Sequence, residues 1–127
     1  MWQVSDLLGK GLEALALAEN QGVNICFGSD LLGGMHKHQL EEFSLRCRVQ
    51  SAASVLRSAT TTCAQLFNME GDVGVVAPGA FADLVVLRRN PLADAFASLI
   101  TDPATAILMV LKEGRIFRSS SNDVVGI

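Results

Sequence analysis

The sequence offers one carboxylate in a position that suits chemistry. Asp30 ends the stretch Gly22–Asp30, where an apolar run leads into a turn of small residues. A short apolar run bounded by glycines predicts a strand over Val23–Phe27, buried on both faces as in parallel sheets covered by helices. Ligands and catalytic groups collect at the carboxyl ends of such strands, where Asp30 falls. The alternative is that Asp30 only caps a following helix, because aspartate is a favoured N-cap residue.

Two histidines follow this aspartate. His36 and His38 have a spacing that would put both side chains on one face of a strand, but they come after a Gly-Gly loop, where spacing guarantees nothing. We therefore expect them at a pocket rim or facing solvent, with metal ligation as the alternative. His38 is the candidate to line a substrate pocket.

The three cysteines, Cys26, Cys47 and Cys63, are widely spaced and form no Cys-x-x-Cys pair. This usage is typical of reduced thiols in a cytoplasm-like compartment. We expect no disulfide, no structural zinc and a cytoplasmic location.

Composition limits the possible functions. The 127 residues suit one domain, and 50% of them are hydrophobic while 18% are charged. Part of this apolar surface is expected to meet a partner or another part of the protein. The net charge of −3 argues against nucleic-acid binding, and no apolar run approaches the roughly 20 residues that span a bilayer. The arginines nearest to forming a cluster are expected on solvated helix faces and at a strand end: Arg46, Arg48, Arg57, Arg88 and Arg89.

Helical elements are expected to surround the strand that carries Asp30. The apolar period predicts a helix from Val4 to about Asn20, ended by Gly22 in a left-handed conformation. A loop over residues 31–35 precedes three helices expected at 39–49, 51–58 and 60–68, the last with Thr60 or Thr61 as N-cap. Short strands are expected at 73–76 and 84–87, then a weak helical link at 92–100. A hairpin pairs 107–111 with 116–117 around Glu113-Gly114.

Four motifs, in order, resemble those of the metal-dependent amidohydrolase superfamily. Residues 28–30 (Gly-Ser-Asp) resemble its Gly-Thr-Asp at the end of the eighth barrel strand, and residues 58–62 resemble its Ala-Thr-x-x-x-Ala helix start. Residues 74–87 look like its Gly-x-Ile-x-Pro-Gly-x-x-Ala-Asp-Leu-Val motif, and residues 110–117 resemble its final hairpin. The run from Leu31 to Phe43 looks most like the imidazolonepropionase-like and Xaa-Pro dipeptidase-like branch, whose members hydrolyse amide bonds in small N-acyl amino acids, dipeptides or cyclic amides.

The resemblance implies roles for particular residues. Asp30 matches the aspartate that touches the active-site metal, zinc or another divalent ion, and takes a proton from the hydrolytic water. Asp83 is expected to serve structure by bonding the turn before its strand. The chain has no match to the family's first-strand His-x-His pair, its bridging carboxylated lysine or glutamate, or its two further histidines.

Because a (β/α)8 barrel needs about 250 residues, the chain resembles the C-terminal fragment of such an enzyme. It would be an α/β piece in which residues 1–70 supply the last helix, strand 8 and the following helices of the barrel. Residues 71–118 would form the C-terminal strands of the small β-sandwich, and 119–127 a mobile tail. We expect this fragment to be inactive alone and to associate with the missing barrel portion. The alternative is a non-catalytic truncated module that folds by self-association into a homo-oligomer.

Overall fold

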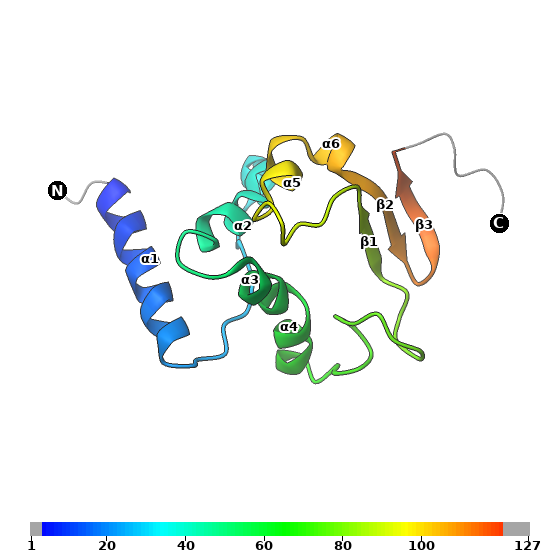
Figure 1. Cartoon of the computed structure of the whole chain (residues 1–127), viewed down its shortest axis with the longest axis horizontal. Coiled ribbons are helices and arrows are strands. Elements are labelled where there is room, and N and C mark those ends of the chain that lie inside the picture. Colours follow the sequence, from blue (N-terminus) through cyan, green and yellow to red (C-terminus); the bar gives the residue numbers. More distant parts are fainter. Residues whose placement is uncertain (1–3, 121–127) are drawn as a thin grey trace.

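The computed structural model describes residues 4–120, which form a helical part and a three-stranded antiparallel sheet. The first helix lies at one end of the molecule and the sheet at the other, with the shorter helices between them (Figure 1). No helix within this range is long and apolar enough to cross a membrane. The elements in chain order are α1 (Val4–Asn20), the 3₁₀ helix η1 (Gly33–His38), α2 (Glu41–Arg46), α3 (Ala52–Ala59), α4 (Thr61–Leu66), β1 (Leu84–Leu87), α5 (Ala97–Thr101), α6 (Pro103–Ala106), β2 (Ile107–Lys112) and β3 (Arg115–Ser119).

The end of α1 confirms the expectation for Gly22. Gly22 has φ +69°, its N–H donates to the Glu19 carbonyl at 3.0 Å, and the next N–H donates to the Ala18 carbonyl at 3.0 Å. These two bonds form a Schellman motif, which satisfies the last carbonyls of the helix. α1 therefore stops where the sequence predicts.

The Glu19 side chain joins this end of α1 to α3. Its carboxylate accepts hydrogen bonds from Ser54 Oγ at 2.5 Å and from Gln50 Nε2 at 2.5 Å. These bonds, the Ser54 bond foremost, hold the pKa of Glu19 below its ordinary value. The charged form of Glu19 is therefore favoured where the two helices meet.

The N-cap of α4 is Thr60, one of the two residues expected there, but its side chain forms no capping bond. Thr60 Oγ1 donates to the Leu56 carbonyl at 2.7 Å, in the preceding helix, and makes no capping bond to α4. Thr61 is itself the first residue of α4. By contrast, α3 has a side-chain cap, because Ser51 Oγ accepts the Ser54 N–H at 3.1 Å.

The sheet has the order β1-β2-β3, and both pairs are antiparallel. The hairpin between β2 and β3 turns at Glu113 (φ +51°) and Gly114 (φ +77°), as predicted. Two successive left-handed residues suit a tight hairpin turn that matches the twist of the strands.

Asp83, the residue immediately before β1, holds this hairpin. Its Oδ1 accepts the Glu113 N–H at 2.7 Å and its Oδ2 accepts from Lys112 Nζ at 2.6 Å. The Lys112 ammonium group and the Glu113 N–H hold the pKa of Asp83 below its ordinary value. Its role is structural, but the turn it bonds is the β2–β3 turn and not the turn before its own strand.

The core lies where α2, α3 and α5 meet. Val55 and Phe96 are almost fully buried, with 0% and 1% of their surfaces exposed. The Phe43 ring packs against Phe27 and Phe96, with centroid separations of 4.4 and 4.6 Å. The core therefore draws residues from both the first and the last third of the chain.

The strands expected at Val23–Phe27 and at 73–76 are wrong. A strand is defined by a hydrogen-bonded neighbour, and in the described range the backbone of Phe27 bonds instead to the last turn of α3, donating to the Ser58 carbonyl at 3.0 Å. Near residue 73 the chain makes one isolated bridge, between Glu70 and Val73. The helix expected at 39–49 is limited to Glu41–Arg46, and the loop at 31–35 runs into η1.

The expected tail falls mostly beyond the part of the chain that the structure describes. Ser119 is the last residue of β3 and pairs with Met109. Residues 121–127 lie outside the described range.

Candidate functional site

Asp30 lies at the start of the segment, including η1, that connects residues 23–29 to α2; residues 23–29 form no helix or strand. Its side chain is exposed and its φ is +48°, in the left-handed region that a non-glycine residue seldom adopts. The helix that follows, η1, begins at Gly33 with Leu32 as its N-cap. The interpretation of Asp30 as a helix cap is therefore wrong.

A cavity of about 390 Å³ lies between this segment and α2. His38 lines it, and His38 Nδ1 lies 2.5 Å from Glu41 Oε1. Ser29 and Leu31, the two neighbours of Asp30 in the chain, line the same cavity, whereas His36 is exposed. The complete lining is Gly28, Ser29, Leu31, Met35, His38, Glu41, Glu42 and Leu45.

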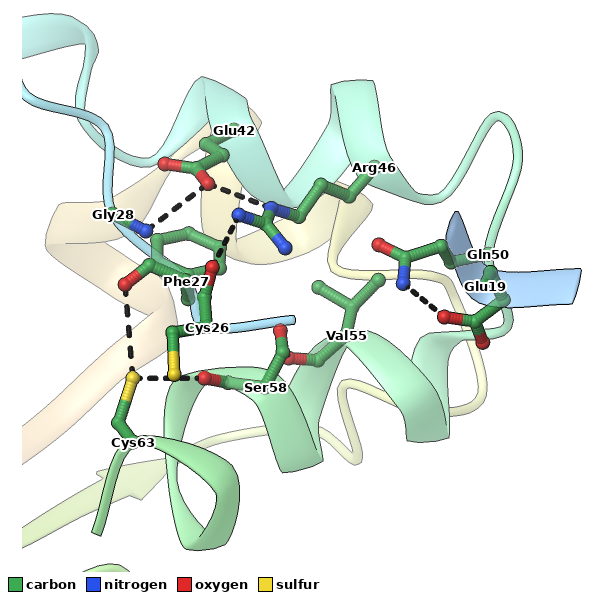
Figure 2. Close-up of polar contacts among 10 residues, drawn as sticks. All are labelled: Glu19, Cys26, Phe27, Gly28, Glu42, Arg46, Gln50, Val55, Ser58 and Cys63. Atoms are coloured by element: carbon green, nitrogen blue, oxygen red, sulfur yellow. Dashed lines mark hydrogen bonds and ion pairs between the residues drawn. The ribbon is translucent and has the colours of Figure 1, made fainter. Parts of the chain in front are cut away.

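An ion pair on α2 binds the backbone just before Asp30. Glu42 Oε1 accepts the Gly28 N–H at 3.2 Å and the Arg46 Nε–H at 2.6 Å. Arg46 Nη2 donates to the Cys26 carbonyl at 2.8 Å, and its guanidinium carbon lies 5.1 Å from the centre of the Phe27 ring. Figure 2 shows both side chains directed at this backbone.

This pair corrects an expectation from the sequence. Arg46 was expected on a solvated helix face, but only 9% of its surface is exposed. The local signal was present, since Glu42 and Arg46 have the i,i+4 spacing of a helical ion pair. That spacing does not reveal that both side chains turn inward against Cys26–Gly28.

The opposite edge of the same backbone is bonded to thiols and to the end of α3. Cys63 Sγ donates to the Phe27 carbonyl at 3.7 Å and to the Ser58 carbonyl at 3.0 Å. Cys26 Sγ donates to the Thr62 carbonyl at 3.6 Å. Burial, followed by the neighbouring Cys63 thiol, raises the pKa of Cys26. All three cysteines are free thiols in the structure.

The residues around Asp30 do not by themselves form a metal centre. Within residues 4–120, no group of three or more His, Cys, Asp or Glu side chains gathers where it could hold a metal ion. A catalytic zinc takes three protein ligands and keeps one position open for water or substrate. The described donor set therefore does not fit a complete zinc site, and Asp30 could contribute only one ligand to it.

Comparison with known proteins shows which family model and which solved structures this chain resembles. The sequence model of the amidohydrolase family matches residues 4–117. A solved prolidase complexed with N-methylphosphonate-L-proline is 45% identical over 87% of this chain, with a TM-score of 0.80, and the match covers 26% of that protein. An amidohydrolase structure is 35% identical with a TM-score of 0.78, again over 87% of this chain and 26% of the other.

A Xaa-Pro dipeptidase with methionine bound in its active site is 27% identical, with a TM-score of 0.73, over 84% of this chain and 25% of that one. No curated protein matches the sequence. The chain thus spans about a quarter of the length of the solved structures that it matches.

Proposed function

Since this chain belongs to the amidohydrolase family, we propose that it is part of a metal-dependent hydrolase that cleaves C–N bonds of the amide or peptide type in a small substrate. The observation that carries the proposal is the 45% identity to a prolidase over 87% of the chain, together with a TM-score of 0.80. Identity at this level extends over both the helical part and the sheet. The proposed unit is therefore the C-terminal quarter to third of a barrel enzyme.

The proposed substrate is a dipeptide whose second residue is proline. In the ligand of the similar prolidase, a phosphonate is attached to L-proline. A tetrahedral phosphorus on the proline nitrogen has the shape that a peptide carbon takes when water adds to it, and enzymes bind that shape more tightly than the substrate. N-acyl amino acids and cyclic amides are the other substrate classes of this branch.

Asp30 and His38 are the proposed functional residues. A bound divalent metal, such as zinc, would lower the pKa of a water molecule, and its remaining ligands would come from outside the described residues. The Asp30 carboxylate would accept the proton from the attacking water and return it to the leaving amine nitrogen. The His38 side chain, which lines the 390 Å³ cavity, would contact the substrate.

The proposal includes the organisation of the chain. We assign residues 1–70 to the barrel and 71–118 to the β-sandwich beside it. Because Asp30 supplies one ligand where a catalytic zinc needs three, the chain alone is expected to be inactive. Its thiols support a reducing, cytoplasm-like compartment, since all three are free.

A chimera tests the proposal. Residues 4–117 would replace the matching quarter of the 45% identical prolidase, and hydrolysis of Xaa-Pro dipeptides would be measured with the parent prolidase as control. We expect activity in the chimera and none in the isolated chain. A chimera that folds and binds metal but hydrolyses no Xaa-Pro dipeptide would overturn the proposed substrate. Tightly bound zinc with turnover by the isolated chain would overturn its dependence on the rest of the enzyme.

A second candidate is a non-catalytic module that buries its apolar surface against another copy. Its support is the exposure of large apolar side chains, including Val76 at 88%, Phe117 at 84% and Leu32 at 80%. An apolar cavity of about 840 Å³, lined by Leu56 and Leu84 among others, also lies between the helices and the sheet. Sedimentation equilibrium separates the two candidates, because a stable monomer at micromolar concentration would contradict self-association.

A further inference from the structure

The segment that carries Asp30 and His38 is a loop closed at its base. It begins after Gly28 and reaches α2 at Glu41. The bond from the Gly28 N–H to Glu42 Oε1 joins residues 14 positions apart. Residues 29–40, which we call the Asp30 loop, therefore begin and end near the same carboxylate, and the 390 Å³ cavity lies between this loop and α2.

Arg46 also bonds to the base of this loop. Its Nε–H donates to Glu42 Oε1, the same oxygen that accepts the Gly28 N–H. Its Nη2 donates to the Cys26 carbonyl at 2.8 Å. The pair thus bonds two alternate backbone groups, the Cys26 carbonyl and the Gly28 N–H, as a neighbouring strand would. The start of the Asp30 loop is fixed two residues before the aspartate (Figure 2).

Stability alone does not account for this pair. The Arg46 side chain is 11% exposed and the Glu42 side chain 15%. Arg46 Nη1 and Glu42 Oε2 are buried with no hydrogen-bond partner among the described residues. A buried ion pair with unsatisfied atoms recovers little of its desolvation cost, so apolar residues of similar volume would serve stability as well or better. What apolar residues could not do is bond the Cys26 carbonyl and the Gly28 N–H.

We infer that Glu42 and Arg46 are a positioning pair that holds the Asp30 loop at its base and thereby sets the direction of the Asp30 carboxylate. This inference rests on the proposed role of Asp30. Glu42 also lines the cavity, but the role inferred here for both side chains is to act through the backbone of Cys26–Gly28. The left-handed φ of Asp30, +48°, is the conformation that the pair maintains.

The test is nuclear magnetic resonance on the intact chain, comparing Glu42→Gln and Arg46→Met with matched exposed controls, Glu70→Gln and Arg48→Met. In Glu42→Gln we expect the Gly28 amide proton to shift upfield, because it loses a charged acceptor. We expect its hydrogen exchange to accelerate by about tenfold or more. The coupling between the amide and α protons of Asp30, which depends on φ, should change in both variants and in neither control. The chemical shifts and hydrogen-exchange rates of the amides in α3 and α4 should not change.

The inference fails if Gly28 exchange and the Asp30 coupling remain unchanged in folded Glu42→Gln or Arg46→Met. If a single variant unfolds, the double variant Glu42→Gln/Arg46→Met is measured in the same way, because it leaves no uncompensated charge. A folded double variant with an altered Asp30 coupling supports the inference, and one with the original coupling overturns it. Unfolding of the double variant as well would mark the pair as a stability element and overturn the positioning role. None of these readings depends on metal or turnover, so they are separate from the chimera test of the proposed function.

Discussion

Gly74 lies against the backbone of Thr60, and no side chain fits between them. A Cβ at Gly74 would lie 2.8 Å from both the carbonyl carbon and the carbonyl oxygen of Thr60. The contact joins two of the sequence motifs, residues 58–62 and 74–87, which are separate in the chain. The glycine that opens the second motif is therefore needed for the approach of the two segments, as well as for its φ of +76°.

Replacing Gly74 by alanine should destabilise the chain by at least about 2 kcal/mol, because backbone strain and a clash with backbone atoms act together. Gly79→Ala is the matched control, since Gly79 also has positive φ (+94°) but open space around it. The control should lose only about 1 kcal/mol, from the left-handed backbone conformation. Urea denaturation of both variants measures the difference, and equal losses would contradict the proposed clash.

Asp30→Asn should leave stability almost unchanged, because the side chain is exposed. In the prolidase chimera the same change should reduce hydrolysis of Xaa-Pro dipeptides by about 100-fold or more, since the side-chain amide of asparagine cannot accept the proton from water. Steady-state kinetics and urea denaturation check the two halves of this prediction. An active Asp30→Asn chimera would remove Asp30 from the mechanism.

Asp83→Ala should loosen the β2–β3 turn without unfolding the helical part. The Glu113 N–H loses its carboxylate acceptor, so its hydrogen exchange should become faster by about tenfold. Asp72→Ala is the control, since Asp72 also has an exposed side chain. Exchange at Glu113 that is the same in both variants would show that the Asp83 bond does not hold the turn.

The contact between α1 and α3 should weaken in acid. The pKa of Glu19 is lowered in the folded chain, so its contribution to stability is present above the ordinary glutamate pKa and is lost as the pH falls through the lower folded value. Stability should therefore decline below about pH 4. Urea denaturation between pH 7 and pH 3 should show a shallower decline for Glu19→Gln than for the original chain. Parallel declines would exclude Glu19 as the cause.

Local signals in the sequence predicted much of the fold. The end of α1 follows from Gly22, and the β2–β3 hairpin follows from Glu113-Gly114 between two apolar runs, because the conformations these residues require are set by their immediate neighbours. The strand expected at Val23–Phe27 was wrong, because strand pairing is not set by immediate neighbours. The burial expected on both faces was wrong as well, because Val23 is exposed and residues 25–27 are half-buried. Strand pairing depends on a second segment that local pattern does not identify.

The sequence predicted Asp30 and His38 from a motif and from residue type, and their functional roles remain predictions. The structure places His38 on the cavity and Asp30 between two of its lining residues. Glu42 and Arg46 were missed, because their importance depends on contacts with residues 14 and 20 positions earlier in the chain. Helical periodicity reports a residue's neighbours on its own helix and says nothing of such distant partners.

The bonded backbone of residues 26–28 has a consequence for solubility. The Cys26 carbonyl, the Phe27 N–H and carbonyl, and the Gly28 N–H all have partners inside the chain. Short segments rich in β-branched and aromatic residues aggregate when such groups are free to pair with another molecule. Here those four groups are already engaged, so residues 26–28 offer fewer free backbone groups to an intermolecular sheet.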